Sequence, residues 1–107
     1  MTNLNDREKA FENRFARDAE LQFKVTARRN RLLGNWAAEK LGLTTAEAEA
    51  YAREVVAADF EEAGDDDVFR KVYGDLTAKG VEVTEHEVRR AMEEKLVEAR
   101  RQFIEEV

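Results

Sequence analysis

Apolar positions recur at helical spacing along most of this sequence, and short polar stretches divide it into segments. Glycines at positions 42, 64 and 80 follow three of these segments, where a left-handed residue closes a helix. No alternating strand pattern is longer than the three residues VEV before Thr84. The predicted helices span residues 5–41, 44–64, 65–79 and 84–104.

Capping residues and apolar stripes support these four helices. The predicted capping pairs are Asn5 with Glu8, Thr44 with Glu47 and Thr84 with Glu87, and Asp65 or Asp66 can cap the third helix. The third helix carries a stripe of Phe69, Val72, Tyr73 and Leu76. The fourth carries Val88, Met92, Leu96, Ala99 and Phe103. The sequence therefore predicts an all-α fold, a four-helix bundle.

The first predicted helix is too long for its neighbours. At 1.5 Å per residue it would reach about 55 Å, whereas the second and fourth, with about 18 and 21 helical residues, would reach only about 27 and 32 Å. Its second half has the richer apolar set, which is Phe23, Ala27, Leu32, Leu33, Trp36, Ala37 and Leu41. We therefore expect a mobile helical arm over residues 1–20 and a bundle over residues 21–107.

Phe11 and Phe15 lie one turn apart on this charged arm. One interpretation is that the arm bends back as a fifth short helix, with both rings in the core. We favour an overhang, because no glycine or proline offers a hinge between Asn5 and Asn30. Short isolated helices are marginal in water. The arm is then expected to fray in the free protein and to become helical when a partner's groove accepts both rings.

Composition excludes several classes of function. With no cysteine and a single histidine, His86, the sequence has too few members for a nucleophile–base pair or a zinc site. The acidic run DFEEAGDDD lacks the ligand spacing of a calcium loop, so capping and solubility explain it better than a metal. We expect no catalytic residue, no metal and no enzyme. The net charge of −6 argues against nucleic acid as a partner.

The chain is expected to be cytoplasmic. It has no cysteine, no apolar run near the ~18 residues that span a bilayer, and no apolar centre of a secretory signal in MTNLNDREKAF. We therefore expect no membrane insertion.

The run ARRNRLLGNW has two interpretations. Arg28 and Arg31, which share a side of the helix, could attract phosphate while Trp36 stacks on a base. Alternatively, the arginines complement the acidic second helix and Trp36 lies in the core. Gly34 inside a helix costs about 1 kcal/mol relative to alanine, and either a close helix crossing or a nucleotide against the backbone would explain it. No Walker-type loop is present, so any nucleotide site here is not hydrolytic.

Three long stretches carry a family resemblance: DREKAFENRFA from Asp6, ARRNRLLGNWAAEKLGL from Ala27 and ADFEEAGDDDVFRKV from Ala58. They resemble the zeta subunit family, small ATPase-inhibitor proteins of alphaproteobacterial F-type ATP synthases. The resemblance runs from Asp6 to about Leu76, and the remaining tail agrees in helical character.

The resemblance implies a mobile N-terminal segment that inserts at a catalytic interface of the ATP synthase, beside the central shaft, and blocks rotation in the hydrolytic direction. Carried over, the inhibitory element runs from about Asn3 to Asp18. Phe11 and Phe15 are its expected anchors. The basic residues expected to meet acidic rims are Arg7, Lys9, Arg14 and Arg17. For each basic residue the alternative is a solvated helix face.

The resemblance also implies weak binding of ADP or ATP on the bundle, for which the expected residues are Arg28, Arg31, Gly34 and Trp36. The expected partners are the catalytic subunits and the central shaft, which would hold the protein at the cytoplasmic face of the membrane enzyme. We expect a monomer when the protein is free. The alternative function is that of a helical sensor of adenine nucleotide or an adaptor.

Overall fold

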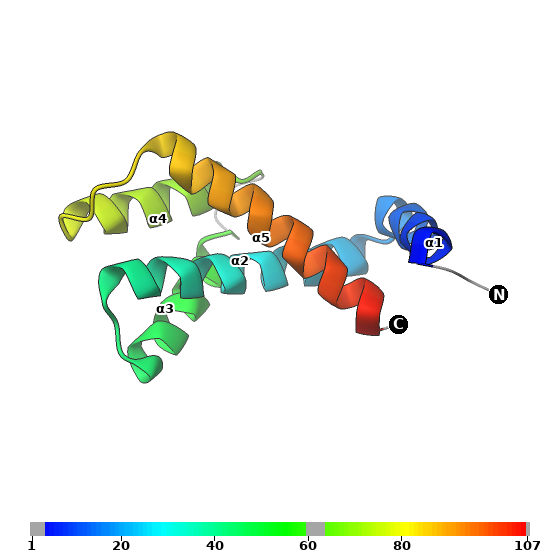
Figure 1. Cartoon of the computed structure of the whole chain (residues 1–107), viewed down its shortest axis with the longest axis horizontal. Helices are drawn as coiled ribbons and strands as arrows, with labels where there is room; N and C mark the ends of the chain where they lie inside the picture. The colour runs from blue at the N-terminus through cyan, green and yellow to red at the C-terminus, as the bar shows by residue number, and fades with distance from the viewer. Residues whose placement is uncertain (1–3, 60–63, 107) are drawn as a thin grey trace.

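The computed structural model of the chain describes residues 4–59 and 64–106. This part of the chain contains five helices and no strand (Figure 1). They are α1 (Leu4–Arg17), α2 (Ala19–Leu41), α3 (Thr45–Ala58), α4 (Asp66–Ala78) and α5 (Glu85–Glu106). The all-α prediction is confirmed. Asn5 lies inside α1, so its predicted role as the first cap is wrong.

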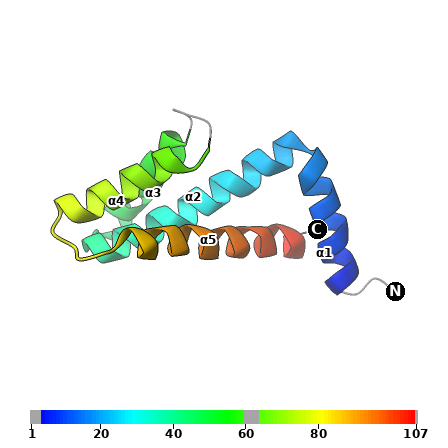
Figure 2. The same cartoon turned by 90° about the horizontal axis from the view of Figure 1, so that it is seen from above.

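Helix α2 is the centre of the fold, because it contacts each of the other four helices. Helix α5 runs antiparallel to α2 along one side of it, and α3 and α4 pack at the end of α2 that is far from α1 (Figures 1 and 2). The molecule is elongated, with extents of 51 × 26 × 26 Å.

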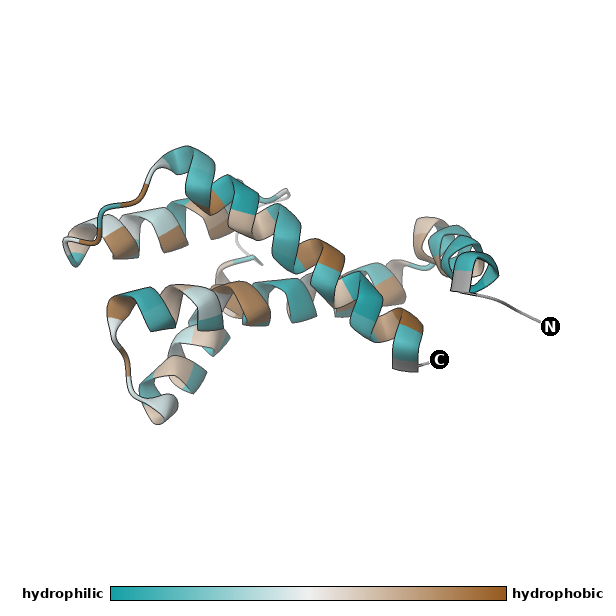
Figure 3. Cartoon of the chain, viewed as in Figure 1, coloured by the Kyte–Doolittle hydropathy of each residue, from teal (hydrophilic) through white to brown (hydrophobic). Residues whose placement is uncertain are grey.

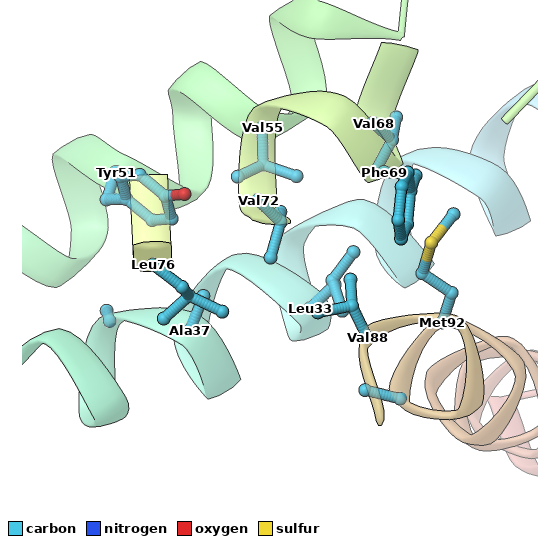
Figure 4. Packing of buried hydrophobic residues seen from close by; sticks show 12 residues of the cluster. Leu33, Ala37, Tyr51, Val55, Val68, Phe69, Val72, Leu76, Val88 and Met92 are labelled. Carbon is cyan, nitrogen blue, oxygen red and sulfur yellow. The ribbon is translucent and has the colours of Figure 1, made fainter. Parts of the chain in front are cut away.

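The main core lies between α2, α3, α4 and the first half of α5. Side chains from all four helices point toward one another there (Figure 4). Its buried members are Leu33, Ala37, Ala38, Tyr51, Val55, Val68, Phe69, Val72, Leu76, Val88, Ala91 and Met92. None of them comes from α1.

A second group of apolar side chains, here called the α1 cluster, lies at the other end of α2 and α5. Its buried members are Phe11, Leu21, Val25 and Ala99, with Phe15, Leu32, Leu96, Phe103 and Ile104 packed against them. The lengths of α2 and α5 explain why it exists. Helices of 23 and 22 residues span about 34 and 33 Å, so α5 reaches the N-terminal end of α2 and leaves apolar surface there for α1.

The prediction of one continuous helix over residues 5–41 is wrong. The helix breaks at Asp18, which has the extended dihedrals φ −106° and ψ 101° and caps α2 by accepting a hydrogen bond from the N–H of Leu21 at 3.1 Å. The amide of Gln22 donates to the carbonyl of Phe15 at 2.7 Å, so a side chain satisfies one of the last carbonyls of α1. Caps on both sides of the break therefore replace the glycine or proline that a hinge usually requires.

Both predicted capping boxes, Thr44 with Glu47 and Thr84 with Glu87, are confirmed by reciprocal hydrogen bonds. The second predicted helix ends earlier than expected, at Ala58. Asp65 stands at the N-cap position of α4 but makes no side-chain cap, because its carboxylate binds an arginine of α2 instead.

Most predicted core positions are confirmed, and one is wrong. Val88, Met92 and Ala99 of the α5 stripe are buried, with Leu96 and Phe103 half-buried. Phe23 was expected in the core, but its side chain is 53% exposed. Leu21 and Val25 point to the α1 cluster in its place, since they share the inner face of α2 one turn apart.

Candidate functional site

Helix α1 has an apolar side and a charged side, and the apolar side is already covered. The rings of Phe11 and Phe15 stack with centroids 6.1 Å apart and planes at 22°. Phe11 is only 7% exposed and Phe15 is half-buried. The favoured overhang is therefore wrong for the isolated chain. Helix α1 bends back as a fifth short helix, which was the alternative interpretation, and Leu21, Val25 and Ala99 cover its rings. Whether α1 moves stays a prediction.

Polar contacts reinforce the docking of α1 on α5. The guanidinium of Arg7 donates to the backbone carbonyl of Ile104 at 2.7 Å. From α5, the guanidinium of Arg100 lies 4.6 Å from the ring centroid of Phe15. Each contact joins α1 to the C-terminal half of α5. The cation–ring contact of Arg100 with Phe15 contributes about 0.5–2 kcal/mol.

The six residues predicted to bind a partner separate into two sets. Arg7, Phe11 and Phe15 face the rest of the chain. Lys9, Arg14 and Arg17 face solvent, where Arg14 lies 3.7 Å from Asp18 in an exposed ion pair. Most of the α1 ribbon is hydrophilic in Figure 3. A partner that meets the docked helix would therefore meet mainly charge, because Phe11 is buried and Phe15 is only partly exposed.

The arginines of the run after Ala27 point to three different places. Arg28 donates to Gln102 at 2.9 Å and lies 4.6 Å from the ring centroid of Phe103, both on α5. Arg29 is buried and donates to Asp65 at 2.8 Å. Arg31 is exposed on the side of α3. The structure therefore does not bring Arg28 and Arg31 to one ligand-sized patch.

Arg31 lines an open groove of about 800 Å³ between α2 and α3, together with Arg53 on the opposite helix. Apolar atoms of Ala52 and Val56 also line it, and Glu39 and Glu49 add negative charge. Arg53 was missed from the sequence, because it stands alone in an acidic helix and only the crossing of α2 and α3 brings it opposite Arg31.

Two other residues predicted to hold a nucleotide have structural roles. A Cβ atom at Gly34 would come within 2.7 Å of the Ala52 Cα, so a close crossing of α2 and α3 requires this glycine. Trp36 packs against the main core, with the ammonium of Lys40 5.1 Å from its ring centroid. Packing accounts for both residues without a ligand, and their nucleotide role stays a prediction.

Each aspartate at the start of α4 pairs with an arginine. Asp65 accepts from Arg29 and Asp66 accepts from Arg89 at 3.0 Å. Asp67 accepts from Arg70 of its own helix. The segment thus fastens α4 to α2 and α5. Within residues 4–59 and 64–106, no group of three or more acidic, histidine or cysteine side chains could hold a metal ion.

Two groups have shifted pKa values with structural causes. Hydrogen bonds from the backbone and side chain of Thr44 lower the pKa of Glu47 below its ordinary value of 4.5. Burial raises the pKa of Tyr51, and its hydrogen bond to Asp75 at 2.8 Å raises it further. Both shifts are explained by a cap and by packing, and neither residue belongs to a group arranged for acid–base catalysis.

The described part of the chain is thus a small all-helical protein that offers docking surfaces, an amphipathic helix and a groove. Comparison with known proteins agrees with that class. The family model for the ATPase inhibitor subunit zeta matches residues 1–102, so the chain belongs to the ATPase inhibitor subunit zeta family. A structure solved by solution NMR is 53% identical, covers 81% of this chain and 99% of its own, and superposes with a TM-score of 0.72. No curated protein matched the chain.

Family membership implies a regulatory subunit rather than a catalyst, with ATP synthase as the enzyme that it inhibits. Among the helices that the structure describes, none combines the length and the apolar character needed to cross a bilayer.

Proposed function

We propose that this protein inhibits ATP hydrolysis by inserting α1 at a catalytic interface of the F-type ATP synthase, next to the central shaft. The observation that carries the proposal is the family match over residues 1–102, which includes the whole of α1. A helix wedged there keeps one catalytic site from closing and so blocks hydrolytic rotation. On this account the protein works at the cytoplasmic face of the membrane enzyme and is a monomer when free.

The position of α1 supports its role as the inhibitory element. It is joined to α2 by the single residue Asp18, and within the described chain it contacts only α2 and α5. The main core contains no residue of α1. The helices that form the main core can therefore stay folded while α1 engages a partner. The division into an inhibitory arm over residues 1–20 and a four-helix bundle over residues 21–107 follows as part of the proposal.

Within α1, Phe11 and Phe15 are the proposed anchors, because buried aromatic rings dominate the energetics of protein interfaces. The basic residues Lys9, Arg14 and Arg17 are proposed to meet acidic rims on the enzyme, which their exposure permits. Arg7 would join them once its bond to Ile104 is broken.

Deletion of residues 2–18 tests the proposal. Inhibition of ATPase activity should disappear. Helicity of the remaining chain should persist with a lowered melting temperature, because Leu21, Val25 and Ala99 lose the cover of Phe11. Deletion of residues 106–107 is a control of the other terminus. Retained inhibition by the chain without residues 2–18 would refute the proposal.

The double variant Phe11→Ala, Phe15→Ala tests the anchors within the full-length chain. Its inhibition should weaken by two orders of magnitude or more, since loss of anchor side chains costs about 2–4 kcal/mol each. The matched control is Ala10→Ser with Ala16→Ser, which changes two exposed positions of the same helix. Unchanged potency of the phenylalanine variant would remove both rings from the mechanism.

A second candidate function is weak binding of ADP or ATP as a regulatory ligand, and the groove with Arg31 and Arg53 favours it. Two guanidinium groups on facing helices suit a phosphate chain. Of the four residues predicted for a nucleotide, Arg31 lines this groove, whereas Arg28 lies against α5. Titration with ADP, followed by NMR shifts of the α2 and α3 amides, should locate binding there. Loss of those shifts in Arg31→Ala, Arg53→Ala would support the site, and shifts confined to other helices would exclude it.

A further inference from the structure

The junction between α1 and α2 keeps two of the backbone hydrogen bonds that a continuous helix would form across it. The N–H of Asp18 donates to the carbonyl of Arg14 at 2.9 Å, and the N–H of Gln22 donates to the carbonyl of Asp18 at 3.0 Å. Both bonds have the spacing of an uninterrupted α-helix. The chain therefore departs from one long helix over a single residue, and Figure 2 shows the two helices turning away from each other there.

The bonds formed at the break stand in for helical bonds. In a continuous helix the N–H of Leu21 would donate to the carbonyl of Arg17, and the carbonyl of Phe15 would accept from the N–H of Ala19. In the bent chain the carboxylate of Asp18 accepts from Leu21, and the amide of Gln22 donates to Phe15. Side-chain bonds thus replace two of the three backbone bonds that the bend removes, the third being the bond from the N–H of Glu20 to the carbonyl of Ala16. Local hydrogen bonding therefore does not by itself select the bent form.

The docking of α1 decides between the two forms in the isolated chain. Bending buries Phe11. It also forms the bond from Arg7 of α1 to Ile104 of α5 and the contact of Arg100 of α5 with the ring of Phe15. Straightening would expose both rings and carry α1 away from α5. A continuous helix over residues 4–41 would extend about 57 Å, longer than the whole folded chain at 51 Å.

We infer that Asp18 is a one-residue helix hinge, which holds the inhibitor closed when bent and presents Phe11 and Phe15 on a continuous helix when straight. This inference rests on the proposed function, since the enzyme's groove supplies the apolar cover that α1 loses from Leu21, Val25 and Ala99. The closed form is autoinhibitory, because the same two rings cannot contact both surfaces. The fraction of straight molecules then limits the apparent affinity for the enzyme.

Substitution at position 19 separates the two forms. Ala19 is the first residue of α2, where proline is well tolerated, and Asp18 has the extended dihedrals that a residue before proline prefers. In a straight helix the same proline would remove a backbone bond and clash with the preceding turn. Ala19→Pro therefore locks the bent form. Ala19→Ser is the matched control, because serine keeps the N–H and permits both forms.

Asp18→Ala acts in the opposite direction. It removes the cap of the bent form and places a strong helix former at the junction. The population of straight molecules should rise about fivefold, the change that corresponds to the loss of about 1 kcal/mol from an N-cap.

The experiment measures a distance as well as inhibition. The chain has no cysteine, so spin labels at Ala10→Cys and Glu93→Cys, both exposed, report the separation of α1 and α5 without further changes. Ala10 lies about 12 Å from Asp18 along the axis of α1. Straightening should therefore lengthen the distance between the two labels by on the order of 10 Å. Circular dichroism melts check that each variant is folded.

We expect Asp18→Ala to increase the long-distance population and the rate of inhibition. Ala19→Pro should show only the short distance and inhibit at least tenfold less than Ala19→Ser. Equal inhibition by Ala19→Pro and Ala19→Ser, or no change of distance in Asp18→Ala, would overturn the hinge. If Ala19→Ser and the unsubstituted chain fail to inhibit, the proposed function falls, and the distances in the free variants still decide whether the hinge exists.

Discussion

The guanidinium of Arg100 on α5 lies 4.6 Å from the ring centroid of Phe15 on α1. The contact joins a residue predicted to bind a partner to a helix that begins seventy positions further along the chain. It places a positive charge on the ring that the proposed function requires α1 to expose. The strength of this contact therefore sets part of the free-energy difference between docked and undocked α1.

Replacement of Arg100 by leucine should weaken the docking of α1 without unfolding the main core. We expect a loss of about 0.5–2 kcal/mol of docking free energy, since leucine keeps some apolar cover but no charge. Hydrogen exchange of the α1 amides measures it, and the α4 amides serve as the internal reference because α4 does not contact α1. Equal protection of α1 in both proteins would show that the ring contact contributes nothing.

Gly34→Ala should destabilise the protein strongly. The new Cβ would come within 2.7 Å of the backbone Cα of Ala52, which cannot rotate away, so α2 and α3 must separate. Overpacking of this kind costs about 1–3 kcal/mol, measured by urea denaturation.

Gly74→Ala is the matched control for that substitution. A Cβ there meets no atom within 4 Å and lies in the interior of α4. Alanine should stabilise the helix by about 0.5–1 kcal/mol. Equal effects of the two substitutions would mean that helix propensity, and not the crossing of α2 and α3, explains Gly34.

Asp65→Ala should destabilise the chain more than Asp66→Ala. Arg29 is only 3% exposed and binds Asp65, so removal of the carboxylate leaves a buried charge without its acidic partner. Because Asp65 is itself half-exposed, we expect a loss of about 1–3 kcal/mol, below the range for fully buried pairs.

Asp66→Ala is the reference variant, because both side chains of the Asp66–Arg89 ion pair are exposed. This pair should contribute less than about 1 kcal/mol to the free energy of unfolding. The double variant Arg29→Met, Asp65→Ala should recover part of the stability lost in Asp65→Ala. A smaller effect of Asp65→Ala than of Asp66→Ala in chemical denaturation would contradict the importance of this pair.

Glu47 should make stability depend on acid pH. Its folded pKa is lower than its ordinary value of 4.5, because Thr44 donates hydrogen bonds to the ionised carboxylate. The stabilisation is therefore fully present above pH 4.5 and is lost as pH falls through the lower folded pKa. Thermal melts of the unsubstituted protein and Glu47→Gln should converge in acid and separate above pH 4.5. A constant difference at all pH values would rule out this linkage.

The site was only partly predictable from local pattern. The charged face with Lys9, Arg14 and Arg17 follows from helical spacing, and the structure leaves it open to solvent. One interpretation put Arg28 and Arg31 on a shared phosphate-binding side, but Arg28 meets α5 and Arg31 lies on the side of α3. Periodicity gives the direction of a side chain around its helix axis, and the neighbour that meets it depends on how the helices are packed.

The two capping boxes and the apolar stripes were settled locally. The boxes at Thr44 and Thr84 depend on residues three positions apart, and the stripe from Val88 to Phe103 depends on a repeat of 3.6 residues. Interactions over such short separations are present whichever way the helices pack, which is why these features could be read from the order of residues.

Long-range packing decides where the rings of Phe11 and Phe15 lie. Asp18 can cap a helix or continue one, and these choices differ little in local free energy. The bend is selected because α5 matches α2 in length and brings Ala99 beside Leu21 and Val25, a surface that Phe11 covers. The local free energies of the bent and straight forms differ by only a few kcal/mol. Apolar burial between segments that are far apart in the sequence therefore selects the bent form.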